Sequence, residues 1–110
     1  MGRDRPEQAF QNQVVQLAHT FGWLVQHTRA AKQGDRWLTP IQGDAGFPDL
    51  VLVHYRRGII FAELKSDTGA LSDAQYQWGR TIKEAGGEWK LWRPKDLDEI
   101  QRRLSGGGKR

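Results

Sequence analysis

The spacing of apolar residues along the chain predicts three helices. Between residues 6 and 21 apolar side chains recur at intervals of three, four and seven, which is the pattern of an amphipathic helix, and a glycine follows. A second helix is predicted from about residue 72 to residue 85, because Ser72 and Gln75 have the spacing of a capping box. A third is predicted from residue 94 to residue 104, with proline at its first position.

Four short apolar runs predict four strands, at residues 23–28, 49–55, 59–65 and 88–93. The third run contains the nearly unbroken segment IIFA, which is typical of a central strand covered on both faces. Residues 29–48 carry Gly, Pro and mixed charge without periodicity, so a long loop is predicted there. The order α-β-loop-β-β-α-β-α predicts a mixed β-sheet with helices packed on it, in two layers or three.

Composition narrows the class of protein. The 110 residues are 37% hydrophobic and 27% charged, which predicts one globular domain over residues 1–104 and a disordered tail over residues 105–110. No run approaches the roughly 20 apolar residues of a membrane span, and the first residues lack the apolar segment of a signal peptide, so we expect a cytoplasmic protein. The absence of cysteine excludes disulfides, thiolate nucleophiles and cysteine-based zinc sites.

The chain is basic, with a formal charge of +4 and a pI near 9.8. This charge suits an anionic partner such as nucleic acid, although many basic domains bind none. Candidate contacts lie in the predicted loop and in the turn between the second and third strands, where basic side chains and one tryptophan could bind phosphates or stack on an unpaired base. They are Arg29, Lys32, Arg36, Trp37, Arg56 and Arg57. Each is equally compatible with an ordinary solvated surface position.

The two strands joined by that turn carry charges where apolar residues would be expected. Asp49 starts one strand, and Glu63 and Lys65 end the other. Because side chains alternate along a strand, Glu63 and Lys65 share a face. We take the turn to pair Tyr55 with Ile59. This register sets Asp49 opposite Lys65 and diagonal to Glu63, with all three charges on one face, and a slip of one residue would separate them.

Two carboxylates this close resist ionisation unless a cation compensates them. Lys65 could compensate one, and a divalent cation could compensate both. Oxygen ligands without sulfur favour Mg²⁺ or Mn²⁺, which can activate a water molecule and stabilise the leaving oxygen of a phosphodiester. Lys65 could orient that water or stabilise charge developing at the phosphorus. The structural alternative is a surface salt bridge at the end of a hairpin.

Several motifs together resemble one known family. GFPDL at residues 46–50, ELK at residues 63–65, the FGW that ends the first helix and LSDAQYQW at residues 71–78 resemble the VRR-NUC family of the PD-(D/E)XK nuclease superfamily. The resemblance runs from about Glu7 to Trp92. It implies an α/β fold of restriction-endonuclease type, in which a mixed β-sheet flanked by helices has an α-β-β-β-α-β core and an extra C-terminal helix.

The resemblance also implies roles for individual residues. The family's metal ligands match Glu7, Asp49, Glu63 and the backbone carbonyl of Leu64, and its catalytic residues match Asp49, Glu63, Lys65 and Gln75. Two of these residues have structural alternatives. Glu7 lies in the first turn of a helix, where a carboxylate is favoured by the helix dipole. Gln75 belongs to the capping box, and both of its roles can coexist.

By the same resemblance the protein would be a Mg²⁺- or Mn²⁺-dependent endonuclease that cleaves branched DNA such as a four-way (Holliday) junction. Such activity would serve DNA repair and recombination, in a bacterial or phage-infected cell. Resemblance to the stand-alone members, which occur in phages, implies a homodimer, and two-fold symmetry would suit paired cuts in a junction. The rival interpretations are a non-catalytic nucleic-acid-binding module on the same fold, a structural protein with a salt-bridge cluster, and a restriction-like enzyme that cuts duplex DNA.

Overall fold

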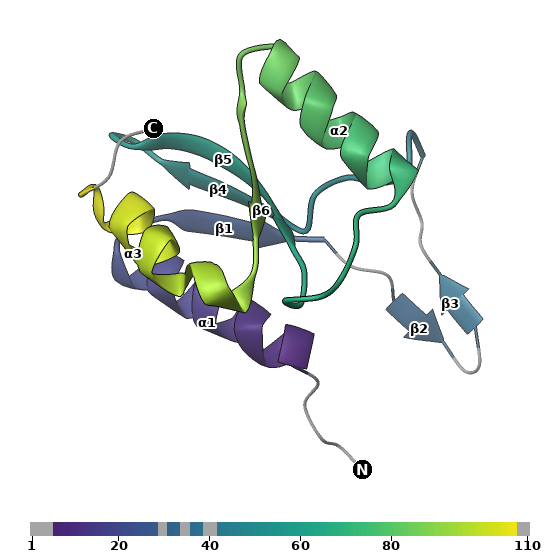
Figure 1. Cartoon of the computed structure of the whole chain (residues 1–110), viewed down its shortest axis with the longest axis horizontal. Coiled ribbons are helices and arrows are strands. Elements are labelled where there is room, and N and C mark those ends of the chain that lie inside the picture. The colour runs from purple at the N-terminus through teal and green to yellow at the C-terminus, as the bar shows by residue number, and fades with distance from the viewer. Residues whose placement is uncertain (1–5, 29–30, 34–35, 39–41, 108–110) are drawn as a thin grey trace.

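The computed structural model describes residues 6–28, 31–33, 36–38 and 42–107. Its elements, shown in Figure 1, are α1 (Pro6–Thr20), β1 (Leu24–His27), β2 (Ala31–Gln33), β3 (Arg36–Leu38), β4 (Leu50–His54), β5 (Gly58–Leu64), α2 (Asp73–Glu84), β6 (Glu88–Trp92), the 3-10 turn η1 (Pro94–Asp96) and α3 (Leu97–Ser105). Each helix and strand predicted from the sequence is present within a few residues of its predicted bounds. In the described part of the chain, no helix is both long and apolar enough to cross a membrane.

The main sheet has four strands in the order β1-β4-β5-β6. β4 is antiparallel to both of its neighbours, whereas β6 runs parallel to β5, so the predicted mixed sheet is confirmed. The parallel step requires a crossover connection, which α2 supplies. Helices α1 and α3 lie on one face of the sheet and α2 lies on the other, which makes three layers (Figure 1).

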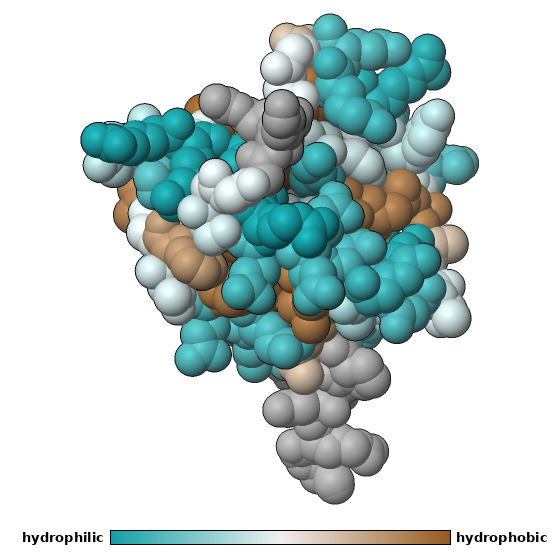
Figure 2. Space-filling view, turned by 60° about the vertical axis from the view of Figure 1, so that its left-hand side comes forward, coloured by the Kyte–Doolittle hydropathy of each residue, from teal (hydrophilic) through white to brown (hydrophobic). Residues whose placement is uncertain are grey.

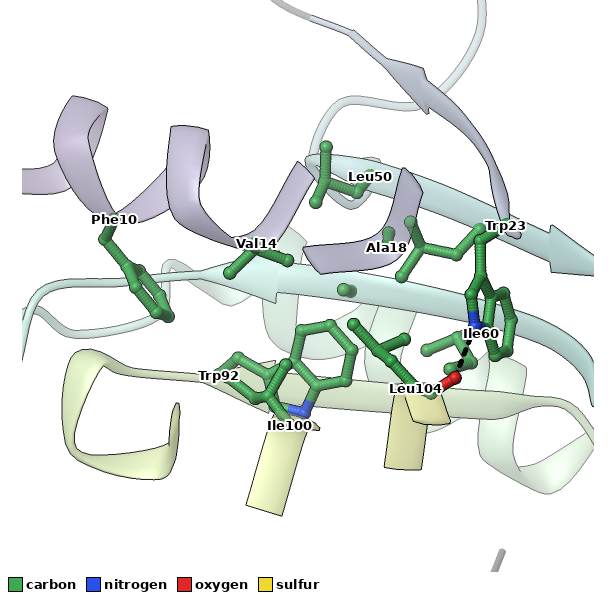
Figure 3. Packing of buried hydrophobic residues seen from close by; sticks show 11 residues of the cluster. Phe10, Val14, Ala18, Trp23, Leu50, Ile60, Trp92, Ile100 and Leu104 are labelled. Carbon is green, nitrogen blue, oxygen red and sulfur yellow. Dashed lines mark hydrogen bonds between the residues drawn. The ribbon is translucent and has the colours of Figure 1, made fainter. Parts of the chain in front are cut away.

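The face toward α1 and α3 carries the hydrophobic core. Alternate residues of β4 and β5 point to this face, as strand geometry requires. The buried side chains, drawn in Figure 3, are Phe10, Val14, Ala18, Trp23, Leu50, Leu52, Ile60, Ala62, Trp92, Ile100 and Leu104. The indole N–H of Trp23 donates to the carbonyl oxygen of Leu104 at 2.9 Å, which joins the start of β1 to the end of α3. Full burial of one large side chain contributes about 1.5–3 kcal/mol, so this face holds the fold together.

The opposite face is only partly covered. α2 lies against Trp89 of β6 at Gly79, where a Cβ atom would be 2.6 Å from Cε2 of the indole, so only glycine permits this approach. Farther from α2, Leu24, Val53 and Ile59 occupy neighbouring positions on three strands and are 75%, 37% and 52% exposed. Figure 2 shows one side of the molecule, on which hydrophilic side chains surround smaller apolar areas.

The long loop predicted at residues 29–48 is not entirely loop. It contains the two-stranded sheet β2–β3, in which Ala31 pairs with Leu38 and Gln33 with Arg36. The last predicted helix also differs, because its first turn is η1 and the α-helix begins only at Leu97. Ser105, which was placed in a disordered tail, is the last residue of α3, and Gly106 caps the helix in the left-handed conformation. Residues 108–110 of that tail lie outside the described residues.

The predicted register of the β4–β5 hairpin is wrong by two residues. His54 pairs with Gly58, so the turn consists of residues 55–57, and Tyr55 does not pair with Ile59. A shift of two residues leaves every side chain on its predicted face, because the strand repeat is two. Beyond the last pair, Leu50 with Ala62, the next opposed positions are those of Asp49 and Glu63. Asp49 therefore lies opposite Glu63 and not opposite Lys65.

Candidate active site

Asp49 and Glu63 meet at the open end of the β4–β5 ladder. Side chains at directly opposed positions have Cβ atoms about 4.5–5.5 Å apart, closer than the diagonal arrangement predicted from the sequence. Oδ2 of Asp49 accepts a hydrogen bond from the backbone N–H of Leu64 at 2.8 Å. This bond holds the half-buried Asp49 carboxylate beside Glu63 at the point where backbone pairing of the two strands stops.

The Glu63 carboxyl group is buried in an unfavourable electrostatic environment. The residue is only 2% exposed. Burial, followed by the nearby negative charge of Asp49, raises its pKa from 4.5 to about 8, although the positive charge of Lys65 acts in the opposite direction. Oε2 accepts a hydrogen bond from Gln75 at 3.0 Å, whereas Oε1 has no hydrogen-bond donor among the described residues. A buried carboxylate oxygen without a donor is costly and needs a reason.

Gln75 connects this carboxyl group to helix α2. Its Oε1 accepts the backbone N–H of Ser72 at 2.9 Å, and its own backbone N–H donates to Oγ of Ser72 at 3.1 Å, so the predicted capping box is confirmed. The remaining polar atom of the side chain, Nε2, donates to Oε2 of Glu63. One side chain thus caps α2 and holds the Glu63 carboxyl group, so the capping role is confirmed and the catalytic role of Gln75 stays a prediction.

The GFPD segment, which ends at Asp49, packs against the same helix. Gly46 has a φ of +99°, and a Cβ atom there would lie 2.5 Å from the carbonyl carbon of Ala74 in the first turn of α2. The ring of Phe47 packs edge-on against Trp78, with 5.0 Å between centroids. The glycine of the motif is therefore needed for the loop to lie against α2. The position of this loop in turn fixes where Asp49 lies, directly before β4.

Lys65 follows the last residue of β5, on the face of the strand that carries Glu63. Its backbone N–H donates to the carbonyl oxygen of Trp92 at 3.1 Å, which continues the pairing of β5 with β6 by one residue. Its side chain is half-buried. The structure therefore brings Asp49, Glu63, Lys65 and Gln75 together, as the motifs predicted.

In the described part of the chain, no hydrogen bond or ion pair joins Glu7 to these four residues. Glu7 is exposed in the first turn of α1, a helix that packs on the opposite face of the sheet. Within residues 6–28, 31–33, 36–38 and 42–107, no three His, Cys, Asp or Glu side chains are arranged to hold a metal ion. Its position in the first turn agrees with the helix-dipole alternative. The metal-binding roles of Glu7 and of the Leu64 carbonyl remain predictions.

The two arginines of the hairpin turn have different environments. Nη1 of Arg57 donates to the carbonyl oxygens of Phe21 at 3.1 Å and Leu104 at 3.3 Å, at the ends of α1 and α3. Its own carbonyl oxygen accepts a hydrogen bond from Arg103 at 2.7 Å. Arg57 therefore ties the turn to both helices, which favours a structural role over a phosphate contact. Arg56 is exposed and remains a candidate contact.

The other candidate nucleic-acid contacts lie in or beside the β2–β3 hairpin. Lys32 pairs with Trp37 in its backbone register, and Arg36 pairs with Gln33. Their side chains, and the whole of Arg29, lie outside the described residues. The hairpin connects the end of β1 to the start of β4. It therefore lies beyond the ends of these two strands, on the side where Asp49 precedes β4 (Figure 1).

The donor set of the site suits a hard divalent cation. Asp49 and Glu63 offer adjacent carboxylates, and Oε1 of Glu63 has no hydrogen-bond donor among the described residues. Oxygen ligands without thiolate or imidazole are those that Mg²⁺ and Mn²⁺ prefer. A cation there would compensate both negative charges and would explain why a glutamate is buried beside an aspartate. The residues present therefore fit the metal that the sequence predicts.

Comparison with known proteins identifies the family and the fold. The family model described as the VRR-NUC domain matches residues 6–95. A solved structure titled "VRR_NUC domain" is similar to this chain with a TM-score of 0.64 and 20% sequence identity, over 88% of this chain and 95% of that one. At this identity the structural match concerns the fold alone. A search of curated protein sequences found no match.

Proposed function

Because the chain belongs to the VRR-NUC family and has its nuclease-type fold, we propose that it is a divalent-metal-dependent endonuclease that hydrolyses DNA phosphodiester bonds. The observation that carries the proposal is that half-buried Asp49 and buried Glu63 lie opposite each other on neighbouring strands, with Lys65 on the same face. An ordinary surface salt bridge would leave its carboxylates solvated and would not raise the pKa of one of them to about 8.

Asp49 and Glu63 would hold Mg²⁺ or Mn²⁺, with the Leu64 carbonyl as a further ligand. When bound, such an ion lowers the pKa of water and neutralises charge on a phosphate oxygen. The chain's own residues prepare the site for it. The Leu64 N–H fixes one carboxylate and the Gln75 amide fixes the other, so both are oriented before substrate binds.

Lys65 is the cationic group of the site. Its ammonium can donate a hydrogen bond to the attacking water or to a non-bridging phosphate oxygen, where negative charge grows during hydrolysis. A half-buried position strengthens such an interaction compared with one in bulk water. In this proposal Lys65 is catalytic, and Gln75 acts by orienting Glu63.

Branched DNA, such as a four-way junction, is the proposed substrate, and a homodimer the proposed assembly. Both follow from resemblance to stand-alone members of the family. The formal charge of +4 supports an anionic substrate, since each phosphate contact by a basic side chain releases counterions. A two-fold dimer would present two sites to two strands of a junction. Light scattering of the purified protein tests the assembly, with twice the mass of the 12.6 kDa chain expected and a monomer contradicting it.

The function is tested with three labelled substrates of one sequence context: a four-way junction, a flap and a plain duplex. Each is incubated with the protein in Mg²⁺, Mn²⁺ or EDTA, and products are resolved on a denaturing gel. We expect metal-dependent cleavage that favours the junction. Preferential cleavage of the duplex would identify a restriction-like enzyme. Binding without cleavage in any metal would identify a non-catalytic module and would contradict the proposal.

A further inference from the structure

The segment that follows Lys65 is hydrogen-bonded to the residues that follow β6, by the side chain of Arg93 and by the backbone N–H of Lys95, which donates to Oδ1 of Asp67 at 3.2 Å. Nη1 of Arg93 donates to the carbonyl oxygens of Ser66 at 2.6 Å and Gly69 at 2.7 Å. The backbone N–H of Gly69 also donates to the Ser66 carbonyl at 3.3 Å, so residues 66–69 close a turn around the guanidinium. We call residues 66–69, held in this way, the lysine turn. Short bonds from a charged donor to two carbonyls are stronger than neutral ones, which makes this turn a fixed structure.

Gly69 of the lysine turn lies beside the side chain of Lys65. A Cβ atom added at Gly69 would lie 3.5 Å from Cδ and 3.6 Å from Cβ of Lys65, and 3.2 Å from Oγ of Ser66. The two distances to Lys65 are ordinary van der Waals contacts, and only the distance to Ser66 is tighter, so the backbone at Gly69 runs alongside the aliphatic part of the lysine. The turn therefore borders one side of the side chain that carries the ammonium group.

From this geometry we infer that Arg93 is a positioning residue for Lys65: it fixes the lysine turn, and the turn confines the lysine side chain so that its ammonium stays beside Asp49 and Glu63. The inference rests on the proposed function for its catalytic consequence. A lysine side chain has four rotatable bonds and loses up to ~2 kcal/mol of conformational free energy when fixed, so an unsupported lysine would sample many positions. Arg93 itself touches neither carboxylate in any described contact.

The test changes Arg93, which holds the lysine turn, and leaves Lys65 itself unchanged. Arg93→Gln removes the charged donor, and Arg93→Lys restores a charge that can reach the same carbonyls. Arg102→Gln is the matched control, because Arg102 is an exposed arginine of α3. A misplacement of about 1 Å in a catalytic group can lower a rate by up to ~100-fold. We expect Arg93→Gln to lower kcat by about 10- to 100-fold with little change in KM, Arg93→Lys to restore part of the loss, and Arg102→Gln to leave kcat unchanged.

A second measurement does not depend on DNA or metal. Reductive methylation of the metal-free protein, followed by mass spectrometry of its peptides, measures how fast each lysine amine reacts. We expect Lys65 to react severalfold faster in Arg93→Gln than in the wild type, because a released side chain is more accessible, while exposed Lys83 of α2 reacts at an unchanged rate. Unchanged labelling of Lys65 together with unchanged kcat would overturn the inference.

A third variant covers the case in which Arg93→Gln does not fold. Gly69→Val keeps Arg93 and its two acceptors but adds methyl groups beside Cδ of Lys65, so a lower kcat and an altered labelling rate of Lys65 are expected. A Gly69→Val protein that folds and shows wild-type values would also overturn the inference. If the wild type cleaves no DNA at all, the proposed function fails, whereas the labelling of Lys65 still decides whether the lysine turn confines it.

Discussion

Glu63 is the residue on which the chemistry of the site depends. It is a carboxyl group at 2% exposure, opposite a second carboxylate, with one oxygen held by Gln75 and the other without a hydrogen-bond donor among the described residues. Because its pKa is raised to about 8 from 4.5, the folded metal-free protein retains a proton there that the unfolded chain releases. Ionisation of Glu63 therefore opposes folding as the pH rises from about 4.5 to about 8.

Replacing that carboxyl by an amide should stabilise the metal-free protein. In Glu63→Gln the new amide can donate to Asp49, so the repulsion disappears. An unsatisfied buried group costs roughly 1–3 kcal/mol, and 1 kcal/mol changes Tm by about 4–8 °C in a domain of this size. We expect Tm above pH 8 to rise by several degrees in EDTA, and to lose the increase that Mg²⁺ gives the wild type.

Thermal unfolding with EDTA or Mg²⁺ measures both effects, and Glu99→Gln, an exposed position on α3, is the matched control. A wild-type Tm that does not respond to Mg²⁺ or Mn²⁺, combined with a less stable Glu63→Gln, would show that the pair of Asp49 and Glu63 is structural.

Individual site residues were predictable where the alternation of side chains along a strand is enough to decide which face they lie on. Asp49, Glu63 and Lys65 share a face in the observed register and in every register shifted from it by an even number of residues. Gln75 was predicted from the motif and contacts Glu63. Glu7 was not predictable in this way, because its distance from the site depends on how α1 packs on the sheet. The role of Arg57 was not predictable either, since its acceptors Phe21 and Leu104 are far away in the sequence.

Among the elements, the β4–β5 hairpin shows what a sequence pattern leaves open. Both strands were predictable from their apolar runs, but the turn could close at Tyr55 or one residue earlier, and Arg-Arg-Gly does not decide between the two. His54 decides it physically: its Nδ1 accepts the backbone N–H groups of Arg56 at 3.1 Å and Arg57 at 3.2 Å, which closes the turn over residues 55–57. A histidine at a strand end gives no sequence signal for such a role.

This role of His54 predicts a pH dependence of stability. Burial, followed by the positive charge of Arg57, lowers the pKa of His54 below 6.5. The folded state therefore binds this proton less readily than the unfolded chain, so the stabilising contribution of the neutral ring is complete above about pH 6.5 and is lost as the pH falls below it.

In His54→Asn the side-chain carbonyl can still accept from the turn but cannot titrate. We expect this variant to have a lower Tm than the wild type at pH 8, since it loses the contact between the His54 and Trp23 rings, and a flatter decline between pH 6.5 and 5. Denaturant unfolding at several pH values measures the slope. Parallel curves for the two proteins would exclude His54 as the titrating group.

Helix α2 links stability to the site, because its first turn holds Gln75 and its middle lies on Trp89. In Gly79→Ala the new methyl would begin 2.6 Å from the indole. Such overpacking typically costs about 1–3 kcal/mol. We expect a Tm lower by several degrees and slower cleavage, because the shifted helix moves Gln75 away from Glu63. Thr81→Ala, on the exposed side of α2, is the control, and equal Tm values for the two variants would contradict the packing argument.

The β2–β3 hairpin is the element that the sequence did not predict. Each of its strands has three residues, too short for an alternating pattern to stand out from a polar loop. Tertiary context, not local propensity, decides such strands.

In the whole molecule, the two faces of the sheet carry different kinds of residues. The face toward α1 and α3 holds the buried core, whereas the face toward α2 holds the carboxylate pair at one end of the ladder. This separation allows polar groups to be brought together without interrupting the core. It also means that a conservative change at the site can remove its chemistry and leave the fold intact, which makes a direct test of the central claim feasible.

The substitution expected to remove the chemistry of the site and keep the fold is Asp49→Asn. An asparagine oxygen can still accept the Leu64 N–H that Asp49 accepts at 2.8 Å, so folding is retained, while one negative charge of the pair is lost. The measurement is single-turnover cleavage of a labelled four-way junction in Mg²⁺, with Asp44→Asn, an exposed aspartate of the preceding loop, as the control. Our account predicts that Asp49→Asn lowers the rate by at least ~100-fold, a loss of about 2.7 kcal/mol in transition-state stabilisation, while Asp44→Asn and the wild type cleave alike. Cleavage by Asp49→Asn at the wild-type rate would contradict it.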